Sequence, residues 1–409
     1  MRIVNLSVKA VEDRSISSKK TDLKRMKKLA VVTTHPIQYH VPWMIRLAER
    51  QIRIKVFYTW EQSGSGNIYD AGFGRNIQWD IPLLEGYEHE FVNNVARSPG
   101  VHHFRGIINP DLIERIESWA PDGLLVIGWN YHSHLRAMRH FHGKVPVYFR
   151  GDSVLLHERW FFRKFLRRHF LTWVYKHVDY ALYVGSNNKS YYLRYGLSPD
   201  QLLFSPQAVD IERFAEPAVL YDRQAQQQRD AMGIPAGQLT VLFAGKMTRV
   251  KNPGFILDLA EACRSLPISF IMVGDGHLKK ALQRRAEDKP NIHFMHFQNQ
   301  RIMPAIYRIG DIFIMPSLKE TWGMAINEAM ACGKPVIASD KVGCATDLVL
   351  EDKTGIIFRQ GDLDKCVRFL RKACTDREAL AEMGRNAAAL IQFFSFSHIV
   401  DSLERVMEL

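Results

Sequence analysis

Short apolar runs alternate with amphipathic segments along most of the chain. The apolar runs end in turn residues such as Gly, Pro and Ser, which is typical of buried strands, and the segments between them have helical spacing. This alternation predicts an α/β protein with doubly wound parallel sheets. The predicted strands are 29–33, 54–58, 123–127, 146–149, 181–185, 240–244, 268–273, 291–297, 311–315, 335–338 and 354–358.

Two sets of strands in 409 residues predict two domains. A polar segment with Pro217 and Pro235 separates the sets and predicts a linker. A Gly-rich segment, 62–77, is long for a connection, so we expect a mobile or functional loop there. The expected order is a basic leader at 1–28, a first domain at 29–214, the linker at 215–238, a second domain at 239–390 and a final helix at 391–409.

The predicted helix 324–332 is apolar on nearly all sides and should be buried, yet Glu328 lies in its middle. A buried carboxylate without a partner is costly, so polar groups must meet it. Glu320 lies on the preceding loop, and the first amides of the helix form an anion site. Carboxylates for hydroxyl groups beside amides for phosphate suit a sugar linked to a nucleoside diphosphate. The alternative is that Glu320 is a solvated loop charge and Glu328 pairs with a basic core residue.

The Glu-x7-Glu spacing, followed by Ala-Met-Ala-Cys-Gly-Lys-Pro-Val, resembles the signature of the retaining glycosyltransferases of family four, of bacterial polysaccharide type. The resemblance covers nearly the whole chain from Leu29 and is strongest over 240–361. It implies the GT-B fold, in which two Rossmann-like domains face each other across a cleft and a C-terminal helix packs back on the first domain. The first domain would bind the acceptor and the second the donor.

The implied activity is that of a hexosyltransferase that retains the anomeric configuration. It would transfer a sugar from a UDP- or GDP-sugar to a glycan or lipid-linked acceptor in polysaccharide or glycoconjugate biosynthesis. The resemblance places Glu328 on the ribose and Glu320 on the transferred sugar. Lys246, where the family usually has Arg, and Lys251 would bind the donor phosphates, so neither a metal nor a cofactor is expected. The other expected donor contacts are Gly245, Gly276, Gln298, Trp322, Gly323, Met324 and Ala325.

Polar and aromatic residues follow several predicted strands of the first domain, where open α/β sheets bind ligands. At the point where the family often has a catalytic histidine, this chain has Arg150 and Asp152. Asp152 is the expected substitute, with His157 as the other candidate; alternatively, Arg150 and Asp152 pair with each other. The residues expected in the acceptor site or cleft are His35, Gln38, His40, Trp129, His132 and Arg150, each with a structural hydrogen-bonding role as the alternative.

The formal net charge of +12 favours anionic partners. In the basic segment 157–177, Arg159, Arg163 and Arg167 recur every fourth residue among many aromatic residues. This pattern predicts either contact with an anionic membrane surface or a core helix with one solvated face. No apolar run is long enough to span a membrane, and the five cysteines form no Cys-x-x-Cys motif. We therefore expect a cytoplasmic protein without a zinc site, with peripheral contact on the inner face of the plasma membrane left open.

Two other functions stay open. One is a sugar-nucleotide epimerase or a phosphorylase on the same fold, although no motif for a pyridoxal lysine is present. The other is a basic protein that binds a membrane or nucleic acid. That function explains the charge but leaves Glu328 and the Gly-Lys turn at 245–246 without a purpose, so no specific nucleic acid is expected.

Overall fold

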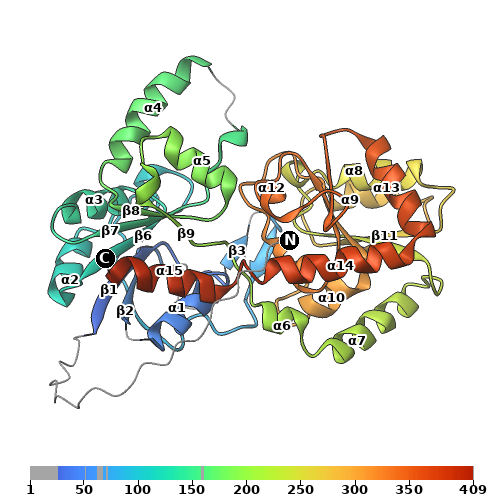
Figure 1. Cartoon of the computed structure of the whole chain (residues 1–409), viewed down its shortest axis with the longest axis horizontal. Coiled ribbons are helices and arrows are strands. Elements are labelled where there is room, and N and C mark those ends of the chain that lie inside the picture. The colour runs from blue at the N-terminus through green and yellow to red at the C-terminus, as the bar shows by residue number, and fades with distance from the viewer. Residues whose placement is uncertain (1–25, 51, 62–67, 71, 158–160, 409) are drawn as a thin grey trace, which may run out of the picture.

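The computed structural model describes residues 26–50, 52–61, 68–70, 72–157 and 161–408. These residues form two α/β domains that lie side by side, each built on its own parallel sheet (Figure 1). The predicted fold class, two Rossmann-like domains in a GT-B arrangement, is confirmed.

In the described part of the chain, the sheet of the first domain has seven parallel strands. Their spatial order is β5 (Glu88–Phe91), β2 (Ile52–Tyr58), β1 (Lys27–Thr33), β6 (Gly123–Ile127), β7 (Val147–Arg150), β8 (Tyr180–Tyr183) and β9 (Leu202–Phe204). The central strands are apolar and buried because helices cover both faces of the sheet. The helices of this domain are α1 (Val41–Ala48), α2 (Leu112–Trp119), α3 (His132–Phe141), α4 (Phe161–Tyr175) and α5 (Ser186–Arg194).

The sheet of the second domain has six parallel strands among the residues described. Their order is β12 (Ile292–Met295), β11 (Ile268–Val273), β10 (Leu239–Ala244), β13 (Ile312–Met315), β14 (Val336–Ser339) and β15 (Gly355–Phe358). The helices of this domain are α8 (Gly254–Ala262), α9 (Lys279–Arg285), α10 (Met303–Ile309), α11 (Met324–Ala331), α12 (Ala345–Leu348), α13 (Leu363–Thr375) and α14 (Arg377–Ile391). The order of both sheets brings the carboxyl ends of the central strands to the interdomain side, where ligand sites of such folds lie.

The segment predicted as a linker is largely helical. Helix α6 (Ile211–Ala215) precedes it, and α7 (Ala218–Ala231) occupies most of it. Helix α7 lies against α10, and the Arg229 Nε atom donates a hydrogen bond of 2.8 Å to the Ile309 carbonyl. Most of α7 faces solvent, with Ala225 buried, which explains why a polar composition concealed a helix.

The last helix, α15 (Phe396–Glu408), returns from the second domain to the first (Figure 1). Its apolar face, including Ile399 and Leu403, is buried in the same core as Trp43 of α1. The Tyr148 hydroxyl of β7 donates a hydrogen bond of 3.3 Å to the Val406 carbonyl. The first helix of the described part of the chain and the last one thus share one core.

Two expected segments differ in the structure. Strand β1 begins at Lys27, inside the predicted leader, and residues 1–25 of the leader lie outside the described part. The predicted loop 62–77 contains an antiparallel hairpin of β3 (Ile68–Asp70) and β4 (Arg75–Ile77); its residues 62–67 and 71 are also outside the described part. Across the ranges that the structure describes, no helix is long and apolar enough to cross a bilayer.

Candidate active site between the domains

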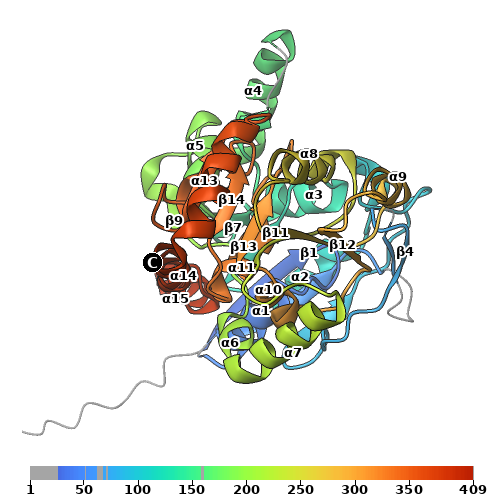
Figure 2. The same ribbon diagram turned by 90° about the vertical axis from the view of Figure 1, so that its right-hand side faces the viewer.

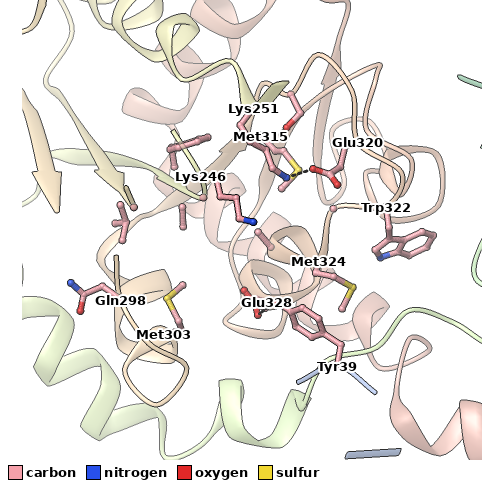
Figure 3. Close-up of a pocket in the computed structure, with 18 of the residues that line it drawn as sticks. Tyr39, Lys246, Lys251, Gln298, Met303, Met315, Glu320, Trp322, Met324 and Glu328 are labelled. Atoms are coloured by element: carbon pink, nitrogen blue, oxygen red, sulfur yellow. Dashed lines mark hydrogen bonds and ion pairs between the residues drawn. The ribbon is translucent and has the colours of Figure 1, made fainter. Parts of the chain in front are cut away.

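A cavity of about 440 Å³ lies between the domains (Figure 3). The second domain lines it with the carboxyl ends of β10, β11 and β13 and with the start of α11. The first domain contributes Gln38, Tyr39, Asp70, Phe73 and Asp152. The cavity therefore has the position that the topology of two facing α/β sheets favours for a ligand.

Glu328 lies on α11 at the floor of this cavity, and only 3% of it is exposed. Its carboxylate accepts a hydrogen bond of 3.0 Å from the Tyr39 hydroxyl and one of 2.6 Å from the Tyr307 hydroxyl. Burial raises the pKa of Glu328, while the two tyrosines and the charge of Arg213 act in the opposite direction. Within the described residues no Lys or Arg forms an ion pair with Glu328, so hydroxyl groups, rather than a basic core residue, meet the carboxylate.

Two lysines lie above Glu328 at the start of the second domain (Figure 3). Lys246 follows β10, and its Nζ atom lies 2.8 Å from the Asp70 Oδ2 atom of the first domain. Lys251, in the 3-10 turn Arg249–Lys251, forms an ion pair with Glu320. Both cations therefore face the cavity from one side, and Glu320 is a paired, half-buried group rather than a solvated charge.

The loop before α11 gives the cavity its shape. Gly323 has φ +112°, and a Cβ atom there would lie 3.0 Å from both Met315 Sδ and Val342 Cγ1, so only glycine fits without strain. Met324 and Ala325, in the first turn of the helix, line the cavity. Since the amides of a first turn have no partner within the helix, this end of α11 is suited to an anionic group.

Several side chains join the two domains at the edge of the cavity. The Thr321 hydroxyl donates a hydrogen bond of 2.8 Å to Asp152. Trp322 donates from its indole nitrogen to Asn327 over 2.8 Å, and Asn327 donates to the Gln207 carbonyl over 2.9 Å. The structure thus brings Asp152, together with Asp70 of the same domain, to the cavity that holds Glu320 and Glu328 of the second domain.

Residues 224–390 match the family model described as "Glycosyl transferases group 1". This matched region spans most of the second domain. The resemblance expected from the motif around Glu328 is confirmed.

Two curated relatives illustrate the match. A sulfoquinovosyl transferase, SQD2 of Arabidopsis thaliana, is 28% identical over 296 residues, which cover 68% of this chain and 55% of that protein. A D-inositol 3-phosphate glycosyltransferase of Gordonia bronchialis is 28% identical over 190 residues, 43% of this chain and 41% of that protein. The chain spans about half the length of these relatives.

Solved structures share the whole fold. Anabaena HepE in complex with UDP has a TM-score of 0.69 at 18% identity, over 94% of this chain and 100% of that chain. A glycosyltransferase from Rickettsia africae has a TM-score of 0.70 at 14% identity, over 93% of this chain and 98% of that chain. At these identities the likeness concerns the fold, so the details of the candidate site rest on the chain's own residues.

Most of the residues expected to contact a donor do line the cavity. They are Gly245, Lys246, Lys251, Gln298, Glu320, Trp322, Gly323, Met324, Ala325 and Glu328, joined from the first domain by Gln38 and Asp152. Gly276 lies elsewhere: a Cβ atom there would lie 2.6 Å from the Met247 carbonyl oxygen, so it allows two backbones to pack closely. Gly274 lines the cavity in its place.

Arg150 was expected in the cleft, and the structure corrects this. Its guanidinium is 2% exposed and donates to the carbonyls of Ser205, at 2.6 Å, and Pro206, at 2.7 Å. Burial lowers the pKa of Arg150 to about 10, and these carbonyls satisfy its donors. Arg150 therefore holds the end of β9 instead of contacting a ligand or pairing with Asp152.

Four aromatic residues expected in the cleft also lie outside the described lining of the cavity. His35 is bonded to the neighbouring Thr34 hydroxyl and packs on Trp60, and His40 is enclosed beside Trp43. Burial lowers the pKa of His35 to about 4 and that of His40 to about 3, so both are neutral at pH 7. Their backbone turn positions Gln38 and Tyr39, whose side chains do reach the cavity.

Trp129 and His132 contact other parts of the first domain instead of the cavity. Trp129 packs edge-on against Phe170 of α4, with ring centroids 5.6 Å apart, and His132 lines a second, mainly apolar groove beside α3. Helix α3 begins at His132 itself. The side chain of His157, the other candidate, lies outside the described part of the chain.

Sequence reasoning missed Tyr39, Tyr307, Asp70 and Phe73. Tyr39 lies between Gln38 and His40, and no local pattern distinguishes it from its neighbours. Asp70 and Phe73 lie in the segment that was predicted to be a loop. Its two strands have three residues each, which is too short for an alternation of apolar and polar residues to indicate a hairpin.

Proposed function

We propose that the protein is a retaining glycosyltransferase that transfers a sugar from a nucleoside diphosphate donor, UDP- or GDP-linked, to a glycan or lipid-linked acceptor. The observation that carries the proposal is the meeting of three groups in one cavity. These are a buried carboxylate that already accepts hydroxyl donors, two lysines, and the first turn of α11. The group 1 family match and the solved HepE complexes with UDP and UDP-glucose support it.

In the proposed reaction, Glu328 accepts hydrogen bonds from the ribose hydroxyls, as it does from Tyr39 and Tyr307. The bond between the anomeric carbon and the phosphate oxygen breaks, and its electron pair stays on the diphosphate. Lys246, Lys251 and the α11 amides stabilise that charge, which is the contribution that a metal makes elsewhere. The acceptor hydroxyl attacks from the face that the phosphate leaves and passes its proton to the departing phosphate oxygen.

Glu320 and Asp152 would orient the transferred sugar from opposite sides of the cleft. Glu320 comes from the loop before α11, and Asp152 follows β7 of the first domain. Since each of the two carboxylates is bonded to a neighbour, Lys251 or Thr321, their positions are set before a ligand arrives.

The test is a screen of UDP-, GDP- and other nucleotide-sugars, with the anomeric configuration of the product read by NMR. We expect that one of the donors is consumed and that the product keeps the anomeric configuration of that donor. Glu328→Ala and Lys251→Ala should each lower kcat/KM by roughly a hundredfold or more. Near-normal turnover in both variants would defeat the assignment. If the product is a free isomer of the nucleotide-sugar, the protein is an epimerase. If the reaction requires inorganic phosphate, the protein is a phosphorylase.

The proposal includes contact with an anionic membrane through α4, which would place the protein at the cytoplasmic face. The helix projects from the first domain (Figure 2), and Phe165 and Leu166 are 68% and 73% exposed. The C-terminal part of the helix is anchored in the core through Leu171, Val174 and Tyr175, so the exposed part that supports the membrane contact is the part before it. Arg159 and the Arg163 side chain lie outside the described residues. The adjoining groove combines Phe170 and Trp173 with Arg136 and Arg139, and exposed apolar groups beside arginines fit a lipid surface better than nucleic acid.

Sedimentation with vesicles of phosphatidylglycerol and phosphatidylcholine tests this contact. We expect binding that Leu166→Glu reduces about tenfold, because the substitution removes an apolar side chain and adds a negative charge. Leu350→Glu is the matched control, since Leu350 is 41% exposed on the second domain. Equal binding by both variants would refute a role for α4.

A further inference from the structure

The β3–β4 hairpin belongs to the first domain by sequence but contacts the second (Figure 1). Three kinds of contact hold it there. Asp70 pairs with Lys246, Phe73 packs on Phe297, and the segment that follows the hairpin accepts hydrogen bonds from Asn299 and from the Arg301 amide. The hairpin therefore closes one side of the cavity described above.

The turn of the hairpin fixes the Asp70 carboxylate. Its Oδ1 atom accepts the amide hydrogens of Gly72, at 2.8 Å, and Phe73, at 3.1 Å, which leaves Oδ2 for Lys246 at 2.8 Å. Burial opposes ionisation, but Lys246 and the two amides outweigh it and hold the pKa of Asp70 below its usual value. The carboxylate is thus an anion held on the same lysine that the proposed reaction assigns to a phosphate.

The Phe73 ring contacts both Lys246 and Phe297 of the second domain. The Lys246 ammonium is 5.0 Å from the ring centroid, and the Phe297 ring meets it edge-on at 4.8 Å. The stem of Lys246 runs along the hairpin so closely that a Cβ atom on Gly72 would lie 2.6 Å from Lys246 Cδ. Trp79 adds a third ring at 6.4 Å from Phe297. This aromatic cluster, Phe73, Trp79 and Phe297, opens into the cavity beside Gln298.

We propose that the hairpin completes the donor site: Phe73 packs on the nucleobase against Phe297, and Asp70 is a positioning residue that gives up Lys246 to the donor diphosphate. The inference rests on the proposed function and deepens it. A planar base suits a cluster of rings at the cavity wall. A diphosphate carries more negative charge than one carboxylate, so it can replace Asp70 as the partner of Lys246. The lysine then has an anionic partner both before and after the donor binds.

The exchange is tested with Asp70→Asn, which removes the competing charge and keeps the shape. Calorimetric titration with UDP, with GDP in a parallel arm, should show a Kd about fivefold lower than that of the unmodified chain. The Kd of the matching nucleoside, uridine or guanosine, should stay the same because it carries no phosphate. Asp80→Asn is the matched control, since Asp80 contacts the second domain through the Arg301 amide and is not bonded to Lys246. An unchanged or raised Kd for the diphosphate in Asp70→Asn overturns the exchange.

The aromatic contact is tested with Phe73→Ala and Phe73→Tyr. The alanine variant should raise the Kd of diphosphate and nucleoside alike by about tenfold, whereas the tyrosine variant keeps the ring and the affinity. An unaltered nucleoside Kd in Phe73→Ala overturns the base contact. If the unmodified chain binds neither diphosphate, the proposed function itself fails. If the unmodified chain binds UDP or GDP and the variants have the same Kd values as the unmodified chain, only the inference about the hairpin fails.

Discussion

At the scale of the residue, the proposed donor site is built around Glu328. An acid in the middle of an apolar helix predicts a site for hydroxyl groups, and the structure supplies two tyrosine hydroxyls at the wall of a cavity. Hydroxyl donors stabilise a carboxylate without neutralising it, so the group keeps its charge available for a ligand. An ion pair with a buried arginine would have consumed the same charge.

The raised pKa of Glu328 predicts a pH-dependent stability difference from Glu328→Gln. Below the ordinary value of 4.5 the group is neutral in both folded and unfolded chains, so the two proteins differ least. As pH rises toward and through the raised folded pKa, the unfolded chain ionises first, and the unmodified protein loses stability relative to the variant. The free energy of unfolding, measured in urea, should therefore be higher for the variant than for the unmodified protein by a larger amount at pH 7 than at pH 4. A difference that does not change with pH would contradict the raised pKa.

At the scale of the element, α11 depends on how it begins. Its loop must turn sharply between Met315 and Val342, and Gly323 provides the left-handed backbone that this turn requires. The first turn then faces the cavity while the rest of the helix is enclosed by the core. A glycine followed by an apolar helix is thus part of the site as well as of the fold.

Gly323→Ala should lower the free energy of unfolding by about 2 kcal/mol or more, from backbone strain and the contacts with Met315 and Val342. Gly333→Ala, at the other end of α11, is the matched control. Its φ is +67°, and the nearest atom to a new Cβ lies at 3.7 Å, so only backbone strain applies and about 1 kcal/mol is expected. Chemical denaturation measures both. Equal losses would show that the contacts around Gly323 are unimportant.

At the scale of the whole molecule, the two domains are joined in more than one place. Helix α15 enters the core of the first domain, while hydrogen bonds such as Ser186 to Asp347 and Asn187 to the Gly343 carbonyl connect the domains beside the cavity. Because the chain crosses between the domains twice, at α6 and after α14, their relative position is constrained at the side opposite the hairpin.

Leu403→Ala in α15 should lower the free energy of unfolding by about 2–5 kcal/mol, because the side chain is fully buried in the first-domain core. Leu220→Ala, at a site 49% exposed on α7, should change it little. Thermal unfolding followed by circular dichroism compares the two. A small loss for Leu403→Ala would mean that α15 is not an integral part of that core.

The amino-acid sequence alone was sufficient to predict the parallel α/β class, the six strands of the second sheet and five of the seven strands of the first, but not its short edge strands β5 and β9. It also predicted that second-domain residues gather around Glu328. These follow from short-range periodicity and from motifs whose residues are near neighbours in the chain. Tertiary structure decided which first-domain residues reach the cavity: Tyr39 and Asp70 do, whereas His35, His132 and Arg150 do not. Tyr39 and Glu328 are 289 positions apart, and Asp70 and Lys246 are 176 apart. Contacts of that kind depend on how two domains pack and on which way a strand end turns, and no local pattern encodes either.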